Sequence, residues 1–463
     1  MDKKYSTLIK NMGYLLMGNF ASKILVFLLV PLYTSVLTTG EFGSYDAIIT
    51  TVQFIAPIVV LNISDGVMRF LMDGKRKNEI YAIGQRYVCL GIAVMGIFCF
   101  LNYVFKFLNF LNGYELYCFI YSVFFILNNY FVQVAKGLNE VSVMAKGGVI
   151  GTFSMLCSNI LLLLVFKRGI QGFFIANILG QALPVIYYLW KFKIKVVLHS
   201  KIEHDLQKQM LIYSVPLIFN TIGWTINSSL DKYCVIYFCG IEVSALVAIA
   251  YKIPTILSVV YAIFTQAWQI SAINAYNNKD RNAFYSQIFL LTNGLGAVLC
   301  AVLLVGNQLI SKILFAKDFY QAWKFVPFLL LSIMFNQTAG FIGPLLSAKK
   351  ESNAMAKAAV IGSISNLIFN IVLIQLFGAQ GAVVATAISS FIIYFVRWWY
   401  ARNLLNSEIY PVIYITWILL LIGSFAEVVL ETHIVQCVVL VLIIIINKQS
   451  LLAVLNKIMK RGK

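Results

Sequence analysis

Charged residues are scarce in this sequence, and their scarcity defines the solvent that the protein occupies. Only 12% of the 463 residues are Asp, Glu, Lys or Arg, whereas 60% are hydrophobic and the mean hydropathy is +0.84. Soluble globular domains contain roughly 45–50% apolar residues and about 25% charged residues. This composition excludes an ordinary soluble domain and places the chain in a lipid bilayer.

Residues that carry catalysis or bind metals are also few. The three histidines, His199, His204 and His433, show no metal-ligand spacing, and the eight cysteines include no C-x-x-C pair. Cysteines in apolar stretches behave as small hydrophobic residues rather than as a disulfide or metal framework. No G-x-x-x-x-G-K-[ST] loop is present, so we do not expect ATP hydrolysis by this chain. We therefore expect no enzyme, no catalytic residues, no cofactor and no metal site.

Apolar stretches of about 20 residues, long enough to cross roughly 30 Å of hydrocarbon, recur along the whole chain. Their spacing leaves no room for a soluble domain. We predict an all-α integral membrane protein with fourteen transmembrane helices. The predicted helices start near Gly13, Tyr45, Ile83, Gly113, Gly147, Ile170, Leu211, Val243, Phe284, Ala322, Ala354, Gly381, Tyr410 and His433.

The chain contains a copy of part of itself. Residues 140–166 match residues 351–377 at a fixed offset of 211 residues with no gap. The shared residues include Glu140/Glu351, Met144/Met355, Lys146/Lys357, Gly151/Gly362, Ser154/Ser365, Asn159/Asn370 and Phe166/Phe377. A weaker match precedes it, in which Tyr33, Gly40 and Ser44 recur as Tyr233, Gly240 and Ser244. Internal repeats in an apolar chain are typical of secondary transporters, whose substrate sites lie where the repeats meet.

The repeat predicts two lobes of six helices, residues 1–192 and 211–403, joined by a cytoplasmic linker at 193–210. Residues 404–463 would add helices 13 and 14 and a basic cytoplasmic tail. Because an even number of helices separates the copies, the repeats are parallel. We expect a pseudo-two-fold axis along the membrane normal, with a cavity between the lobes that opens to alternate sides.

Basic residues collect in alternate loops, which predicts that both termini are cytoplasmic. The sequences Lys3-Lys4 and Lys75-Arg76-Lys77 illustrate this pattern, whereas Lys312, Lys317 and Lys324 lie on the opposite side. The net charge of +18 then reflects a cytoplasmic surface that faces anionic membrane lipids. No groove-reading motif is present, so we expect no nucleic-acid partner.

Two lysines fall deep within predicted spans. A charged side chain at the bilayer centre costs about 2.5–3.5 kcal/mol on insertion scales and therefore needs a reason. Lys23 lies ten residues after the start of helix 1, roughly 15 Å deep, and Lys252 reaches a similar depth in helix 8. The two lysines predict a cationic cavity shared by the lobes. The alternative is that each lysine snorkels to an interface or pairs structurally.

Acidic residues in the spans allow two interpretations each. Asn62, Asp65 and Arg69 share one face of helix 2, so Asp65 and Arg69 form either an intrahelical ion pair or part of a substrate gate. Asp231 and Lys232 close helix 7, where they form either a headgroup-level ion pair or a functional site. Asp65, Asp231 and Lys232 are thus candidates for ion coupling or gating.

Several segments, taken in order along the whole chain, resemble the Wzx-type polysaccharide flippases of the MATE-like superfamily. The segments are Val30–Thr34, Glu41–Asp46, Asp65–Asp73 (DGVMRFLMD), Tyr213–Asn220, Asp231–Tyr233, Lys252–Pro254 and Phe264 with Gln266–Trp268. The resemblance implies two six-helix bundles and transfer of an undecaprenyl-diphosphate-linked oligosaccharide to the outer leaflet of the cytoplasmic membrane. It also implies membrane lipids as partners and a polysaccharide polymerase as a candidate partner. Helix 1 departs from the drug exporters, because it carries Lys23 and no acidic residue at mid-depth.

The charges and the resemblance agree on an anionic cargo. A diphosphate headgroup needs positive partners, which Lys23 and Lys252 would provide, with Arg69 as a helper at the inner gate. Asp65 or Asp231 would couple transport to an ion. The alternative on the same fold is an exporter of drugs or small metabolites, for which an acidic cavity is expected. A membrane-embedded glycosyltransferase or polymerase would require a large periplasmic loop or a carboxylate cluster, and neither is visible.

Overall fold

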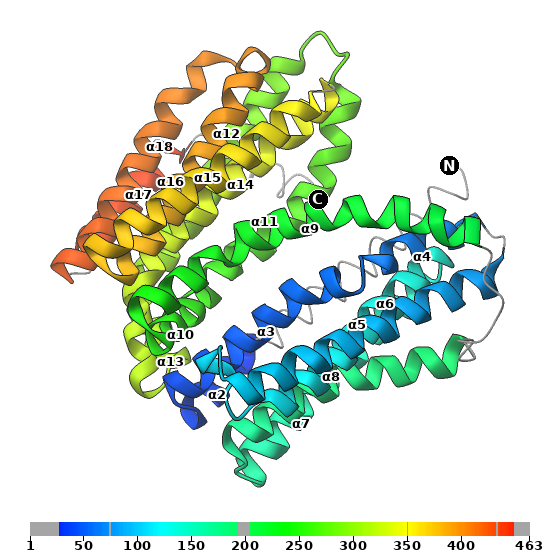
Figure 1. Cartoon of the computed structure of the whole chain (residues 1–463). Coiled ribbons are helices and arrows are strands. Elements are labelled where there is room, and N and C mark those ends of the chain that lie inside the picture. Colours follow the sequence, from blue (N-terminus) through cyan, green and yellow to red (C-terminus); the bar gives the residue numbers. More distant parts are fainter. Residues whose placement is uncertain (1–26, 74–75, 193–203, 350, 432–433, 449–463) are drawn as a thin grey trace, which may run out of the picture. The chain divides into compact units, whose positions relative to one another are not determined.

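The computed structural model describes residues 27–73, 76–192, 204–349, 351–431 and 434–448, and these ranges are helical without a β-strand (Figure 1). The first helices are α2 (Val30–Val36), α3 (Thr39–Val59), α4 (Ile63–Leu71), α5 (Lys77–Phe105), η1 (Asn109–Leu111), α6 (Glu115–Gly137), α7 (Val141–Asn159), η2 (Ile160–Val165), α8 (Gly169–Phe192) and α9 (His204–Cys239). They are followed by α10 (Ile241–Ala250), α11 (Lys252–Ala275), α12 (Arg281–Val305), α13 (Asn307–Leu314), η3 (Lys317–Phe325), α14 (Val326–Ala348), α15 (Ser352–Phe377), α16 (Ala379–Ala401), η4 (Arg402–Leu404), η5 (Ser407–Ile409), α17 (Tyr410–Leu430) and α18 (Ile434–Ile446). The protein is therefore all-α.

Eleven helical segments in the described ranges are long and apolar enough to cross a membrane, so the chain is a multi-pass membrane protein. The first predicted span, which starts near Gly13, lies outside the described residues. Each of the other thirteen predicted spans overlaps a described helix. Two of these helices, α9 and α18, are not among the eleven. The all-α membrane fold is confirmed, whereas the count of fourteen stays a prediction.

The contacts within the chain divide it into two units, Met1–Ser229 and Leu230–Lys463. The division falls inside α9, so the first part of this helix packs in unit 1 and its last part in unit 2. The predicted linker, 193–210, lies largely outside the described residues, and its described end forms the start of α9. The predicted lobe boundaries stay a prediction.

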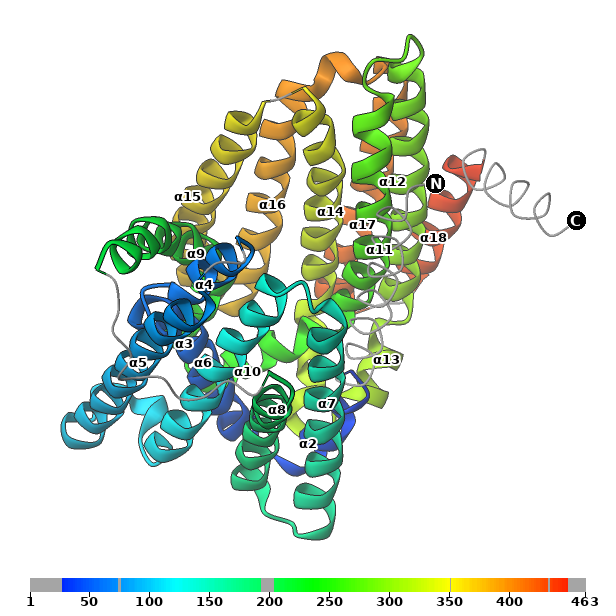
Figure 2. The same cartoon turned by 90° about the vertical axis from the view of Figure 1, so that its right-hand side faces the viewer.

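Three consecutive helices recur in the two units. In unit 1, α6 and α7 both pack on α8, and in unit 2, α14 and α15 both pack on α16. Figure 2 shows α14, α15 and α16 side by side. The bounds of α6 and α14, Glu115–Gly137 and Val326–Ala348, differ by the same 211 residues that separate the sequence repeats. The sequence repeat thus belongs to a three-helix repeat in the structure.

A break between α3 and α4 is the main irregularity of unit 1. Thr38 and Glu41 form a capping box at the start of α3, and Pro57 lies in its last turn. Leu61 and Asn62 then adopt left-handed conformations, with φ of 51° and 48°, before α4 begins. A left-handed residue cannot continue a right-handed helix, so this membrane segment is discontinuous.

Small residues allow α7 and α8 to pack closely. A Cβ atom added at Gly151 would lie 2.7 Å from the carbonyl oxygen of Gly180 in α8. In unit 2, a Cβ atom added at Gly362 would collide with Ile393 in α16. The small residues at Gly147 and Gly151 therefore allow a close helix contact of the kind common in membranes.

This contact predicts a specific loss of stability. The substitution Gly151→Ala should destabilise the protein by about 1–3 kcal/mol, because neither backbone can move without separating α7 from α8. Gly148→Ala is the matched control, since no atom lies within 4 Å of its added Cβ. Thermal unfolding of the detergent-solubilised variants measures the difference. Equal unfolding temperatures for the two variants would contradict the assigned contact.

Candidate functional site

The break between α3 and α4 opens a polar cavity inside unit 1. The cavity has a volume of about 200 Å³. Its polar lining residues are Asn62, Ser64 and Asp65 at the break, Asn129 and Gln133 on α6, and Thr221 on α9. Ala56, Pro57, Val60 and Ile126 complete the wall. A broken helix thus brings a carboxylate, amides and hydroxyls together at a cavity, as discontinuous helices do in membrane transporters.

Two amide side chains hold Asp65. The Nδ2 of Asn62 donates a hydrogen bond of 2.8 Å to one carboxylate oxygen, and the Nε2 of Gln133 donates to the other. The Oε1 of Gln133 is buried and has no hydrogen-bond partner among the described residues. The cavity therefore gathers carboxylate, amide and hydroxyl oxygens, the ligand types that hard cations prefer.

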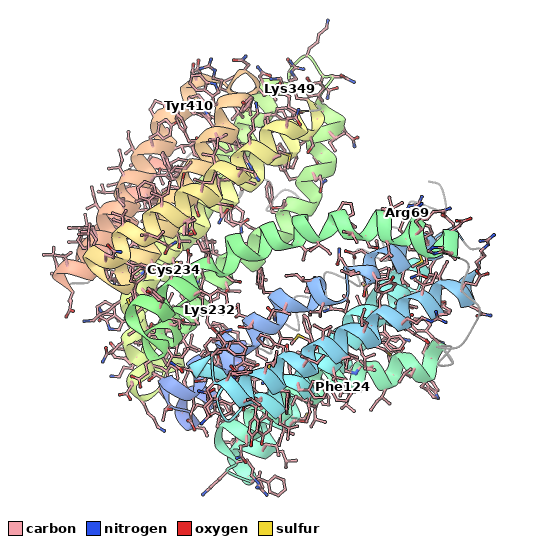
Figure 3. The ribbon with its side chains drawn as sticks, in the orientation of Figure 1. Arg69, Phe124, Lys232, Cys234, Lys349 and Tyr410 are labelled. Atoms are coloured by element: carbon pink, nitrogen blue, oxygen red, sulfur yellow. The ribbon has the colours of Figure 1, made fainter. Side chains whose placement is uncertain are left out.

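Arg69 does not pair with Asp65. Its Nη1 lies 2.8 Å from the Oδ1 of Asp73, and its side chain is 49% exposed near the end of α4 (Figure 3). Of the two interpretations, the intrahelical ion pair between Asp65 and Arg69 is therefore not formed, and a role at a substrate gate stays a prediction. Asp73 lies one turn beyond Arg69 and competes for it, whereas the packing of α6 on α4 supplies Gln133 to Asp65.

Asp231 is the centre of a second polar cluster, which lies in unit 2. One carboxylate oxygen accepts a hydrogen bond from the Nδ2 of Asn370 on α15, and the other accepts one from the hydroxyl of Thr386 on α16. The Nδ2 of Asn370 also lies 3.1 Å from the Oδ1 of Asn366. The Oδ1 of Asn370 is buried without a partner among the described residues. The cluster again surrounds a carboxylate with neutral donors and oxygen atoms.

Sequence reasoning found Asp231 but missed the residues that hold it. The sequence does single out Asn370, because it is the repeat partner of Asn159. The sequence does not single out Thr386 or Asn366, since isolated polar residues in apolar helices are common. Their contact with Asp231 depends on how α15 and α16 pack beside the end of α9.

The predicted cationic residues are placed only in part. Lys23 lies outside the described residues, so its position beside Lys252 stays a prediction. Lys252 is half-buried and opens α11, within the membrane-spanning segment Ile241–Ala262. The preceding residue, Tyr251, lies beside Asp231 and Thr386. Lys232, half-buried, follows Asp231 on α9 (Figure 3).

The described part of the chain contains no group of three or more His, Cys, Asp or Glu side chains that could hold a metal ion. Each of the two clusters contains a single carboxylate. Their composition suits a weakly bound monovalent cation or a proton better than a tightly held transition metal.

The fold matches solved structures of membrane transporters. A lipid II flippase, MurJ, in an inward closed conformation matches with a TM-score of 0.68 and 15% sequence identity, over 95% of this chain and 98% of that chain. An inward-facing multidrug resistance MATE family transporter of the MOP superfamily matches with a TM-score of 0.58 and 14% identity, over 85% of this chain and 94% of that chain. At these identities the likeness shows a shared fold.

Sequence comparison gives the family. An uncharacterized membrane protein of Methanocaldococcus jannaschii, MJ1068, is 21% identical over 449 residues, which cover 86% of this chain and 85% of the relative. The model of the polysaccharide biosynthesis protein family matches residues 8–269. Because this match spans more than half of the sequence, the chain belongs to the polysaccharide biosynthesis protein family.

Proposed function

We propose that this protein is a flippase that moves a polyprenyl-diphosphate-linked oligosaccharide across the cytoplasmic membrane by alternating access, for the synthesis of a surface polysaccharide. The observation that carries the proposal is membership of a polysaccharide biosynthesis family by a chain with a transporter fold. The resemblance to Wzx-type flippases supports the same cargo, with undecaprenyl diphosphate as the lipid carrier. In the proposed orientation both termini are cytoplasmic.

Lys252 is the proposed contact for the diphosphate, together with Lys23. Its place in the middle of a membrane-spanning segment supports this role, because a lysine at that depth is costly unless it serves an anion or a buried partner. Arg69 is exposed at the end of α4 and paired with Asp73, which supports a role at the entrance rather than in the centre. The lipid tail would stay in the bilayer while the headgroup and sugars cross.

Asp231 and Asp65 are the proposed sites of ion coupling. Each carboxylate accepts hydrogen bonds from neutral amide or hydroxyl donors on neighbouring helices, and these donors satisfy its oxygen atoms without adding a positive charge. Two oxygen atoms, Oε1 of Gln133 and Oδ1 of Asn370, have no hydrogen-bond partner in the part of the chain that the structure describes. They support the same role, since they could turn to a cation. Lys232, beside Asp231, is the candidate gate residue.

A drug or small-metabolite exporter is the second candidate, because the fold also serves multidrug transporters. Deletion of the gene separates the two candidates. We expect loss of the surface polysaccharide and accumulation of lipid-linked repeat units inside the cell, as the export step is missing. Radiolabelled sugar incorporation followed by lipid extraction measures both effects. Normal surface glycan with altered drug sensitivity would instead support the exporter.

The lysine contact is tested by Lys252→Ala. Loss of one charge-assisted contact of about 1.5–3 kcal/mol should reduce flipping about tenfold or more, with normal amounts of protein in the membrane. Lys279→Ala, at an exposed position, is the matched control. Flipping of fluorescent lipid-linked oligosaccharide in proteoliposomes measures the rate. Wild-type flipping by the Lys252 variant would remove this residue from the substrate path.

Ion coupling is tested by Asp231→Asn, which keeps the shape of the side chain and removes its charge. We expect flipping to lose its response to an imposed sodium or proton gradient, because the uncharged amide no longer attracts the cation. Asp280→Asn, at an exposed position in the connection before α12, should respond like the wild type. Proteoliposomes with defined internal and external ion concentrations give the measurement. An unchanged gradient response in the Asp231 variant would exclude this carboxylate as the coupling site.

A further inference from the structure

Unit 2 contains a connection that is longer than its counterpart in unit 1. Between α5 and α6, residues 106–114 form only the short helix η1, whereas between α12 and α14, residues 306–325 form α13 and η3. Helix α17 also lies outside the three-helix repeat, and it packs on α12 and α14. The duplication therefore does not account for α13, η3 and α17, which are features of unit 2.

The unduplicated segments line a cavity of about 430 Å³ that is open to the surface. This volume falls within the range of roughly 300–1,000 Å³ found for small-molecule sites. All its lining residues are polar, charged or aromatic. They are Gln308 on α13, Tyr320, Gln321, Trp323 and Lys324 on η3, and Glu431 at the end of α17. The absence of aliphatic side chains from this lining makes it a poor site for an acyl chain.

The charges that line the cavity cancel. The Nζ of Lys324 lies 3.4 Å from the Oε1 of Glu431, and it lies 5.6 Å from the centre of the Trp323 ring. Both charged side chains are about half exposed, at 47% and 58%, so they can still bond to a ligand. A lining with one cation and one anion favours neither a diphosphate nor a free cation. It suits a neutral ligand with many hydroxyl groups.

Hydrogen bonds from neighbouring helices hold two of the lining residues, Trp323 and Lys324, by their backbone oxygens. The Nδ2 of Asn307 donates to the backbone oxygen of Trp323 at 2.9 Å and to the Oε1 of the fully buried Glu427 at 2.8 Å. On another side, the Nε2 of Gln380 in α16 donates to the backbone oxygen of Lys324 at 2.8 Å. The η3 segment is thus anchored to α13, α17 and α16. A lining held in this way loses little freedom when it binds a ligand.

Backbone conformation adds to this argument. Glu431 has a φ of 51°, a left-handed conformation that is uncommon for residues other than glycine. It lies one turn after Glu427, and its carboxylate reaches Lys324 from that position. A left-handed residue at the C-terminal cap ends a right-handed helix, so α17 stops here and its cap residue lies beside η3.

We propose that this cavity binds a sugar residue of the lipid-linked cargo. Amides and an ion pair would bond to sugar hydroxyls, and the half-buried Tyr320 would contact a sugar ring. In the proposed orientation, the connection between α12 and α14 lies outside the cytoplasm, on the side to which the cargo is delivered. This proposal rests on the proposed function. A sugar site would also explain why Lys324 lies outside the cytoplasm, on the side where the positive-inside rule predicts few lysines.

Isothermal titration calorimetry on the detergent-purified full chain tests the proposal. The probe is a single repeat unit, cleaved from the cell's own surface polysaccharide and carrying no lipid or phosphate. We expect the wild type to bind it, and Gln308→Leu and Glu431→Gln to weaken binding about tenfold, because each change removes a hydroxyl partner. Glu408→Gln is the matched control, since Glu408 is exposed near the other end of α17 and should bind like the wild type. Undecaprenyl diphosphate without sugar should not compete with the probe.

Two results would overturn the proposal. One is a wild-type protein that does not bind the repeat unit, and the other is binding by both cavity variants that equals the wild type. Flipping in proteoliposomes is measured on the same preparations, which separates the two proposals. Normal flipping together with unaffected sugar binding in the variants would contradict the sugar site. The proposed flippase function would stand. Sugar binding at the cavity without any flipping would contradict the proposed flippase function.

Discussion

A carboxylate inside a membrane protein must be bonded by other protein groups, because no bulk water is present to solvate it. Three such carboxylates, Asp65, Asp231 and Glu427, each accept a hydrogen bond from the amide of an Asn or Gln on a different helix. An amide satisfies the carboxylate oxygen without cancelling its charge. Helix packing in this protein is therefore tied to the places where a carboxyl group is kept within the membrane.

This arrangement differs from a buried salt bridge in what it allows next. A lysine or arginine bonded to a carboxylate would have to leave before a cation could bind, and its own charge would then need a partner. Amide groups can turn and offer their oxygen to the cation instead. The buried Oδ1 of Asn370 and Oε1 of Gln133 have no partner among the described residues, so each is available for that change.

The sequence predicted the features that depend on local pattern and length. The apolar stretches marked the membrane helices, and the repeat marked α7 and α15 as equivalent before their packing was known. The break at Leu61 and Asn62 was not predicted. Asparagine tolerates the left-handed conformation, but a single asparagine beside a leucine in an apolar stretch does not by itself indicate a break. The contacts of Asp231 were not predicted for a related reason. Asn370 is 139 residues away in the sequence, and nothing local indicates the contact.

The two copies of one asparagine show how a duplicated element acquires different properties. Asn370 donates to Asp231, and α15 continues as a regular helix through that position. Its repeat partner, Asn159, donates to the backbone oxygen of Met155, and its buried Oδ1 has no partner among the described residues. From the next residue onward the chain becomes a π-helix, η2, a form common at functional sites.

In the weaker repeat that aligns Tyr33 with Tyr233, the residue that corresponds to Asp231 is Pro31, which has no carboxylate. The cluster around Asp231 is thus a property of unit 2, and the looser helix after Asn159 is a property of unit 1. The two copies thus share a sequence pattern, and the residues that face the repeated asparagine differ between them.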